Sequence, residues 1–460
     1  MAKRLTFLLV YVLGSLGTTA AFKLSPLSGR APSALQASQV EASAPLNLDN
    51  LFKVGQRLTS TIAQQLQTPE RIQYAGAMGA RFSYFLLQGI GISLFGLDPA
   101  QKNSGVGIDP TAVTGALVDA ILTDEIDPLN YEVKLAESFE EKSILDGTEQ
   151  RALFNKNFQG IAMLLRNDLK NIEEGKYKMP YDLSVQLAPK QWTPAPVIRQ
   201  LASYLDDKKA VFDRRDRKDG LEVRKTFKST KYPNYYLQNF HYQSDGWLSR
   251  KSARLYDYQV ESLFLGTADA MRRQVMPYVQ DYFTSLKSSG TDESDIRVLD
   301  VATGTGRFAS HLMHNYNTIK LSALDLSPFY LAEAKDMMKQ YDTVTYLEAA
   351  AEDIPADDNS FDAITCVYLF HELPAEVRVK VMKEFNRVLK PGGKLFFVDS
   401  AQEGEVPYDR VLEGFTISAH EPYYLEYTKS DLSKLFEDEG FTVDAKEVHW
   451  VSKLVVGTKQ

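Results

Sequence analysis

The chain has 460 residues, more than one ordinary domain holds, so we expect two or three domains. Hydrophobic residues make up 44% and charged residues 24%, a balance typical of a globular protein that buries a large core. The net charge of −8 argues against general nucleic-acid binding, which needs a basic surface, and the single cysteine, Cys366, excludes an intrachain disulfide.

Residues 1–40 have the features of a targeting sequence. A basic start is followed by an apolar run over residues 5–16, too short to span a membrane, and by small residues at 19–21. A stretch rich in Ser, Ala and Pro then continues without an acidic residue until Glu41. The pattern resembles the two-part presequence of algae with secondary plastids, which implies a plastid protein. A secreted or endomembrane protein is the alternative.

Residues 45–240 are predicted to form a mostly helical region. Asp109 and Pro110 are typical of a helix start, and two further helices are expected over residues 151–174 and from Pro194 onward. Apolar residues recur at helical spacing in the first two helices: Val113, Leu117, Ala120 and Ile121, then Phe154, Phe158, Ile161, Leu165, Leu169 and Ile172.

The apolar, glycine-containing stretch of residues 74–97 is interpreted as a buried helix. Its uncharged part, residues 82–97, is shorter than the roughly 20 residues that a membrane span needs. A helix on the membrane surface, and a true span, stay open as alternatives; peripheral membrane contact through residues 74–97 would suit a lipid substrate.

A strand, a glycine-rich turn, a helix and a second strand follow from residue 296. Asp300 lies at the end of the first apolar run, Gly304 and Gly306 form the turn, and Asp325 closes the second run. Glycine lets the backbone approach a ligand and a carboxylate can bind both ribose hydroxyls, so the pattern predicts an adenosine-containing cofactor.

Two cofactors fit that turn. Residues 304–309 match G-x-G-x-x-A, with Asp325 at the distance expected of a dinucleotide site. Asp300, however, can hold the charged amino-acid tail of S-adenosylmethionine, and a dinucleotide has no ammonium group to hold there.

The elements after Asp325 favour the second cofactor. We expect a buried strand over residues 361–367, a helix over 371–389 that starts near His371, and a turn over 390–393 that stops it. Another strand follows over 395–398, then a helix over 429–438 and a final antiparallel pair of strands over 441–448 and 450–456.

This succession resembles the class I S-adenosylmethionine-dependent methyltransferases, closest to the branch with the quinone-biosynthesis C-methyltransferases. The resemblance covers residues 245–460, with its core from 296. It implies an α/β, Rossmann-like sheet of seven strands with helices on both faces and the last strand inserted beside its neighbour.

The resemblance also implies the cofactor contacts. The methionine part is expected among Asp300, Ala302, Gly304, Gly306, Cys366 and Val367, the ribose at Asp325, and the adenine near Leu326, Ala351 and Glu352. Two departures stand out: Ala302 replaces a glycine, and Ala350 replaces the acid or amide that often binds the adenine amino group, a bond that Glu352 or Asp353 would take over.

Candidate catalytic residues are His371 and Glu372, which follow the fourth strand on the ligand-binding side of the sheet. A histidine here can equally pack under the next helix. The resemblance also implies that the aromatic segment of residues 234–247 covers the cofactor and lines the substrate pocket; ordinary core packing of these aromatic residues is the alternative. The acceptor pocket is assigned to Tyr242, Trp247, His420 and Tyr423. The six histidines show no ligand spacing, and we expect no structural metal.

The sequence therefore predicts a plastid methyltransferase that uses S-adenosylmethionine to methylate a small molecule: a quinone, pigment or lipid precursor. Three alternatives stay open. They are a non-catalytic assembly or binding protein that keeps the fold, a protein methyltransferase, and a dinucleotide oxidoreductase.

Overall fold

The computed structural model describes residues 68–94, 110–122, 147–183, 194–228, 231–405, 412, 415–416 and 419–460. The predicted presequence, residues 1–40, lies outside these ranges. The chain divides into two compact units. Within the described ranges, the first unit holds residues up to 169, 181–183, 194–199 and 261–267, and the second holds 170–180, 200–260 and the remainder from 268.

The first unit is helical. It contains α3 (Pro69–Leu94), α4 (Pro110–Leu122) and most of α5 (Gly147–Glu173). α3 packs along α4, and the Tyr74 hydroxyl donates a 2.6 Å hydrogen bond to the buried carboxylate of Asp168. The faces predicted for α4 and α5 are buried, apart from the half-buried Phe154: Val113, Leu117, Ala120, Ile121, Phe158, Ile161, Leu165, Leu169 and Ile172.

α3 covers most of the apolar stretch at residues 74–97. Several of its large side chains are buried, among them Tyr74, Met78, Phe82 and Phe85. Nowhere in the described ranges does a helix combine the length and the apolar character that crossing a bilayer would demand. Contact with a membrane surface stays a prediction.

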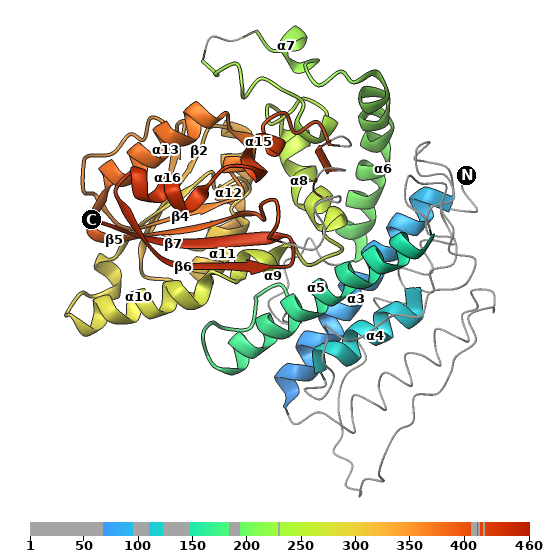
Figure 1. The fold of residues 1–460 in the computed structure, drawn as a ribbon, viewed down its shortest axis with the longest axis horizontal. Helices are drawn as coiled ribbons and strands as arrows, with labels where there is room; N and C mark the ends of the chain where they lie inside the picture. Colours follow the sequence, from blue (N-terminus) through green and yellow to red (C-terminus); the bar gives the residue numbers. More distant parts are fainter. Residues whose placement is uncertain are drawn as a thin grey trace, which may run out of the picture. The chain divides into compact units, whose positions relative to one another are not determined.

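The second unit holds a seven-stranded sheet, drawn in yellow to red in Figure 1, with the strand order β3-β2-β1-β4-β5-β7-β6. Neighbouring strands from β3 to β5 are parallel, whereas β7 is antiparallel to both β5 and β6. The strands are β1 (Arg297–Val301), β2 (Lys320–Asp325), β3 (Val344–Glu348), β4 (Phe361–Val367), β5 (Leu389–Ser400), β6 (Phe441–His449) and β7 (Ser452–Lys459). The last strand is therefore inserted beside β5, and the predicted α/β fold class is confirmed.

Helices cover both faces of this sheet. The helices of the second unit, including two that begin or end in the first, are α6 (Pro194–Arg217), α7 (Val223–Thr226), α8 (Arg250–Leu263), α9 (Ala268–Arg273), α10 (Met276–Ser288), α11 (Arg307–Asn315), α12 (Pro328–Met337), α13 (Ala375–Val388), α15 (Tyr424–Thr428) and α16 (Leu432–Asp438). Figure 1 shows α10 on one side of the sheet and α13 with α16 on the other. Buried residues of β4, β5 and α13, such as Ile364, Phe397 and Phe385, fill the core between the sheet and the helices α13 and α16.

Two predicted boundaries were wrong. α13 ends at Val388 and β5 starts directly at Leu389, so residues 390–393 lie inside the strand instead of forming a separate turn. Gly393 makes this possible, because its backbone approaches the carbonyls of Lys390 and Asp362 so closely that a Cβ would lie within 2.9 Å of both. The helix expected over residues 429–438 starts only at Leu432, as α16, because the Asp431 side chain caps it by accepting a bond from Lys434 N.

Candidate functional site

The site begins at the turn that follows β1. Ala302, Gly304 and Gly306 all have positive φ, at 55°, 58° and 83°. The two glycines differ in their surroundings. A Cβ on Gly306 would lie 3.1 Å from the backbone of Ala334 in α12, whereas a Cβ on Gly304 would meet nothing closer than 4.0 Å. Gly306 therefore permits close helix packing, and Gly304 keeps open space above the strands.

Asp325, at the end of β2, is held by backbone amides. Its Oδ2 accepts a 2.8 Å hydrogen bond from Gly304 N, and its Oδ1 accepts one of 2.8 Å from Ser327 N. Burial raises the pKa of Asp325 to about 6, even though these amides favour the charged form. The carboxylate is thus fixed in place and a cationic ligand would favour its ionised state.

Asp300 lies beside it at the end of β1. The side chain is 2% exposed, and its Oδ1 accepts a 2.5 Å bond from the Thr365 hydroxyl of β4. Burial, with a contribution from Asp325, raises its pKa to about 6 as well. Two carboxyl groups that have no ion pair with a basic residue in the described ranges therefore lie under the same turn.

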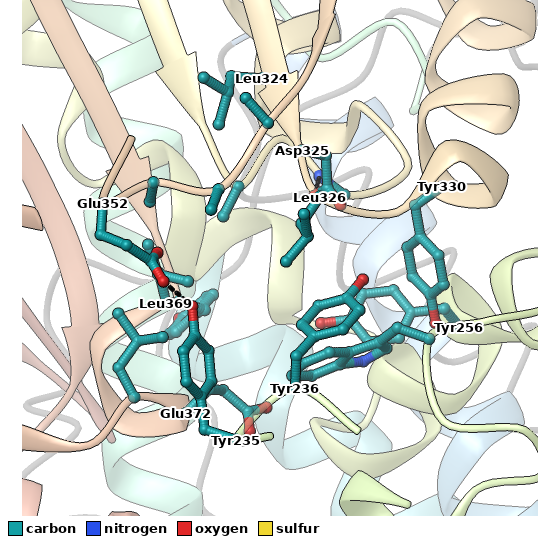
Figure 2. Close-up of a pocket in the computed structure, with 18 residues that line it drawn as sticks. Tyr235, Tyr236, Tyr256, Leu324, Asp325, Leu326, Tyr330, Glu352, Leu369 and Glu372 are labelled. Carbon is teal, nitrogen blue, oxygen red and sulfur yellow. Dashed lines mark hydrogen bonds between the residues drawn. The ribbon is translucent and has the colours of Figure 1, made fainter. Parts of the chain in front are cut away.

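A cavity opens above these strand ends and encloses about 740 Å³ free of protein atoms, part of it open to solvent (Figure 2). Six of the predicted cofactor residues line it: Ala302, Gly304, Asp325, Leu326, Ala351 and Glu352. The other four, Asp300, Gly306, Cys366 and Val367, lie beneath or beside the cavity and are not among its lining residues. Six aromatic rings complete the wall: Tyr235, Tyr236, Trp247, Tyr256, Tyr330 and Tyr368.

The aromatic segment forms one side of this cavity. Trp247 stacks on Phe240 with ring centroids 4.2 Å apart and planes 9° apart. Its carbonyl accepts a 2.6 Å bond from the hydroxyl of Ser327, the residue that caps α12. Tyr236 packs in a small apolar cluster that reaches Leu326. The segment is therefore anchored directly beside Asp325.

Glu352 is engaged by the same segment. The hydroxyl of Tyr235 donates a hydrogen bond to its Oε1, drawn as a dashed line in Figure 2. Burial and this bond raise the pKa of Tyr235. The carboxylate expected at the adenine edge thus already has a protein partner, while Ala350 beside it offers no polar side chain.

The predicted catalytic pair occupies the opposite end of the cavity. Glu372 lines the cavity, and His371 does not. His371 Nδ1 lies 2.6 Å from Oδ1 of Asp399, whose Oδ2 accepts bonds from the amides of Leu369 and Phe370. Burial opposes the charged form, but the Asp399 carboxylate outweighs it and raises the pKa of His371. His371 Nε2 lies 3.6 Å from Oε1 of Glu372, so the histidine is a positioning residue behind that carboxylate.

Of the four residues predicted for the acceptor pocket, only Trp247 lines the cavity. The structure gathers the other three around Gln238, whose Nε2 donates to the Tyr423 hydroxyl at 2.9 Å and whose Oε1 lies 3.1 Å from His420 Nε2. The rings of Tyr242 and His420 are 5.3 Å apart. This cluster braces the aromatic segment from behind.

Several lining or neighbouring residues escaped the sequence analysis. Tyr330 and Tyr368 line the cavity, and the only signals for them were a position one turn after the cap of α12 and a position just after β4. Glu421 is buried next to Glu372, and burial together with that neighbour raises the pKa of Glu421 well above its ordinary value. No local pattern pairs two glutamates 49 positions apart (421 − 372 = 49).

Comparisons with known proteins agree on one family. Residues 298–393 match the model of a methyltransferase domain. The chain is 36% identical over 143 residues to a demethylmenaquinone methyltransferase of Chlorobaculum tepidum, covering 31% of this chain and 52% of that protein. It is 32% identical over 174 residues to the ubiquinone/menaquinone biosynthesis C-methyltransferase UbiE of Rhizobium rhizogenes, covering 37% and 63%.

An uncharacterised methyltransferase of Synechocystis sp. is 30% identical over 154 residues, which cover 33% of this chain and 70% of that protein. Among solved structures, an S-adenosylmethionine-dependent methyltransferase from Aquifex aeolicus matches 39% of this chain and 90% of its own, with 26% identity and a TM-score of 0.30. The chain spans only about half to two thirds of the two quinone-pathway relatives.

Proposed function

Because this chain belongs to the class I S-adenosylmethionine-dependent methyltransferases, we propose that it transfers a methyl group from S-adenosylmethionine to a small organic acceptor. One observation carries the proposal: a single cavity joins Asp325 and Gly304, at the ends of the first two strands, to Glu372 beyond β4. One end suits the cofactor of the family, and the other leaves room for an acceptor.

The residues present fit that cofactor. Asp325 presents a fixed carboxylate for the ribose hydroxyls, and Gly304 leaves space where a side chain would block the ligand. When bound, S-adenosylmethionine supplies an electrophilic methyl group on a positively charged sulfur. The raised pKa values of Asp300 and Asp325, and the tyrosine faces around the cavity, suit a positive ligand.

The chain's own residues would orient the acceptor and exclude water. Methyl transfer is an in-line displacement, which depends on holding the acceptor atom behind the methyl group. Trp247, Tyr256 and Tyr330 close one side of the cavity with apolar faces. Glu372 faces the acceptor end as an ionised carboxylate, because its histidine neighbours lower its pKa despite burial, and it would accept a hydrogen bond or a proton there.

We further propose an aromatic or prenylated acceptor, such as a quinone, pigment or lipid precursor, and a plastid location. The six aromatic rings of the cavity suit a planar apolar molecule. Two relatives are a demethylmenaquinone methyltransferase and a ubiquinone/menaquinone biosynthesis C-methyltransferase. The plastid location rests on the presequence pattern of residues 1–40.

The test is calorimetric titration of the full chain with S-adenosylmethionine, with its product S-adenosylhomocysteine and with NADPH. We expect micromolar binding of the first two and none of the third. Replacing Asp325 with Ala should weaken donor binding by about 10- to 100-fold, since a charged hydrogen-bond acceptor is lost. The control is Asp295→Asn, an exposed carboxylate before β1. Equal affinity in the Asp325→Ala variant, or no donor binding, would refute the proposed cofactor site.

A second candidate, a binding protein without catalysis, is favoured by one observation. Ala350 and the Tyr235–Glu352 hydrogen bond leave the described lining of the expected adenine edge without a free acidic group, and Asp353 is exposed and does not line the cavity. Incubation with methyl-labelled donor and a plastid extract separates the candidates. Label in the organic fraction supports the enzyme proposed above, label in protein supports protein methylation, and label in neither supports the binding protein.

A further inference from the structure

Three side chains converge at the acceptor end of the cavity from segments far apart in the sequence. His241 lies between two carboxylates: its Nδ1 is 3.1 Å from Oε1 of Glu421, and its Nε2 is 3.6 Å from Oε1 of Glu372. One ligand-type atom from each of the three residues lies within 4.8 Å of the other two. A cation bound at about 2.0–2.2 Å from nitrogen and oxygen ligands requires atoms about 3 to 4.4 Å apart.

The two carboxyl groups are buried, and three of their four oxygens have no well-aligned donor among the described residues. The side chain of Glu421 is 0% exposed, and that of Glu372 is 7% exposed. Among the described residues, neither oxygen of Glu421 accepts a well-aligned hydrogen bond, and Oε2 of Glu372 accepts none either. Buried carboxylate oxygens normally have donors or a metal, because burying an uncompensated charge costs several kcal/mol. In the described part of the chain, the imidazole rings of His241 and His371 lie within 3.6 Å of these carboxyl groups, and His371 is already paired with Asp399.

We infer that His241, Glu372 and Glu421 form a binding site for one divalent cation at the edge of the donor cavity. Imidazole together with carboxylates suits Mn²⁺, Fe²⁺ or Zn²⁺ better than Mg²⁺ or Ca²⁺, which prefer oxygen ligands alone. The site does not depend on methyl transfer. Sequence spacing hides it, because its three ligands come from residues 241, 372 and 421.

The surroundings provide the support that metal ligands usually have. His371 lies 3.6 Å from Oε1 of Glu372 and is itself fixed by Asp399 at 2.6 Å, so the orientation of Glu372 is set from behind. The backbone of His241 has a φ of 53°, which directs its ring from the aromatic segment toward the two carboxylates. The site thus combines two buried glutamates with one histidine that is 28% exposed.

Glu372 connects this site to the cavity that it lines (Figure 2). Three protein ligands leave at least one coordination position open. An acceptor oxygen bound there would lose its proton more readily, because a divalent cation lowers the pKa of bound hydroxyl groups. This consequence, unlike the site itself, rests on the proposed function.

The experiment measures cation binding directly. The full chain is stripped with a chelator and titrated with Mn²⁺, and free Mn²⁺ is followed by electron paramagnetic resonance. We expect about one Mn²⁺ per chain and a dissociation constant in the micromolar range. Glu421→Gln should raise that constant at least about tenfold, because it removes a charged ligand while keeping the side-chain shape. Mg²⁺ should compete poorly and Zn²⁺ well.

The matched control is Glu403→Gln, an exposed glutamate in the same region of the chain, which should bind Mn²⁺ like the parent. His241→Asn is a second variant at a partly exposed position and guards against misfolding of the Glu421 variant; circular dichroism checks both. Binding of Mn²⁺ should also raise the unfolding temperature of the parent and not that of Glu421→Gln. Absence of stoichiometric binding at about 1 mM Mn²⁺, or equal affinity in both variants, would overturn the site and leave His241 as an ion-pair partner. Donor titration is independent of this outcome.

Discussion

The two ends of the cavity are built by different means. At the donor end, the backbone amides of Gly304 and Ser327 hold Asp325, and the whole arrangement lies within one β-turn-α-β unit. At the acceptor end, Glu372 lies beside His241 and Glu421, and Asp399 holds its neighbour His371, so side chains from separate segments meet there. A site held by backbone amides tolerates most substitutions around it. In a site made of buried charges, replacing any one of them leaves another charge uncompensated.

The largest effect is expected from Asp399→Asn. Asp399 is 0% exposed and takes four interactions at once, from the amides of Leu369, Phe370 and Ser400 and from the ring of His371. An amide group cannot accept all four, and His371 loses its charged partner. We expect a loss of about 3 kcal/mol in the free energy of unfolding, measured by urea unfolding followed by circular dichroism. Donor affinity should stay within about threefold, because the other end of the cavity is untouched.

Asp444→Asn is the control for this variant, since Asp444 is a partly exposed carboxylate that pairs with Lys394 at the sheet edge. Its cost should stay below about 1 kcal/mol. If Asp399→Asn cost no more than the control, the buried network would not be what holds the acceptor end.

A smaller effect separates the two glycines of the donor end. Gly306→Ala should destabilise the protein by about 2 kcal/mol, because φ is 83° and the new Cβ would lie 3.1 Å from the backbone of α12. Gly304→Ala meets open space, so only the strain of its positive φ remains, about 1 kcal/mol, but its methyl group would project toward the cavity. Urea unfolding should therefore show the larger loss for Gly306→Ala, and donor titration should show the larger loss of affinity for Gly304→Ala.

Gly290→Ala calibrates this comparison. Its φ is 98° and nothing lies within 4 Å of the added Cβ, so it reports the strain of the backbone alone. If Gly306→Ala lowered the free energy of unfolding no more than Gly290→Ala, the close approach to α12 would not contribute to the destabilisation.

The sequence predicts the donor end of the cavity better than the acceptor end. The strands β1, β2 and β4 and the roles of Gly304 and Asp325 follow from local patterns, because apolar runs, glycines and a carboxylate at fixed spacing determine them. β3 was not assigned from the sequence, since it is an edge strand whose side chains are only partly buried. The positions of Glu421, Tyr330 and Tyr368 depend on tertiary packing between distant segments, which no local period encodes.

The pH dependence of donor binding tests the charge of the donor end. Burial raises the pKa values of Asp300 and Asp325 to about 6, so both carboxyls gain protons between pH 7 and pH 5 in the free protein. A cationic donor binds the ionised forms, and its affinity should therefore fall over that interval by about tenfold for each carboxyl that must be ionised. The free energy of unfolding of the free protein depends on pH in the opposite direction. A raised pKa favours the protonated native state, so these two groups stabilise the fold at low pH, and that contribution is lost as pH rises through 6.

Calorimetry at pH 7 and pH 5 measures this change, with Asp325→Asn as the comparison. The variant should show a weaker and flatter pH profile, because one of the two titrating groups is gone. An unchanged profile would assign the pH dependence to another group.

The smallest expected effect concerns Tyr235→Phe. This change removes the hydroxyl that donates to Glu352 and keeps the ring that lines the cavity. Glu352 would then be free to accept a hydrogen bond from the adenine amino group, in place of the acid that Ala350 lacks. We expect donor affinity to rise about two- to fivefold, in line with one hydrogen bond to a charged group partly offset by new desolvation. Tyr232→Phe, a neighbouring ring of the same segment, should leave the affinity unchanged. A weaker Tyr235→Phe variant would mean that the Tyr235–Glu352 bond organises the donor end, so that this end too depends on a side-chain contact between distant segments.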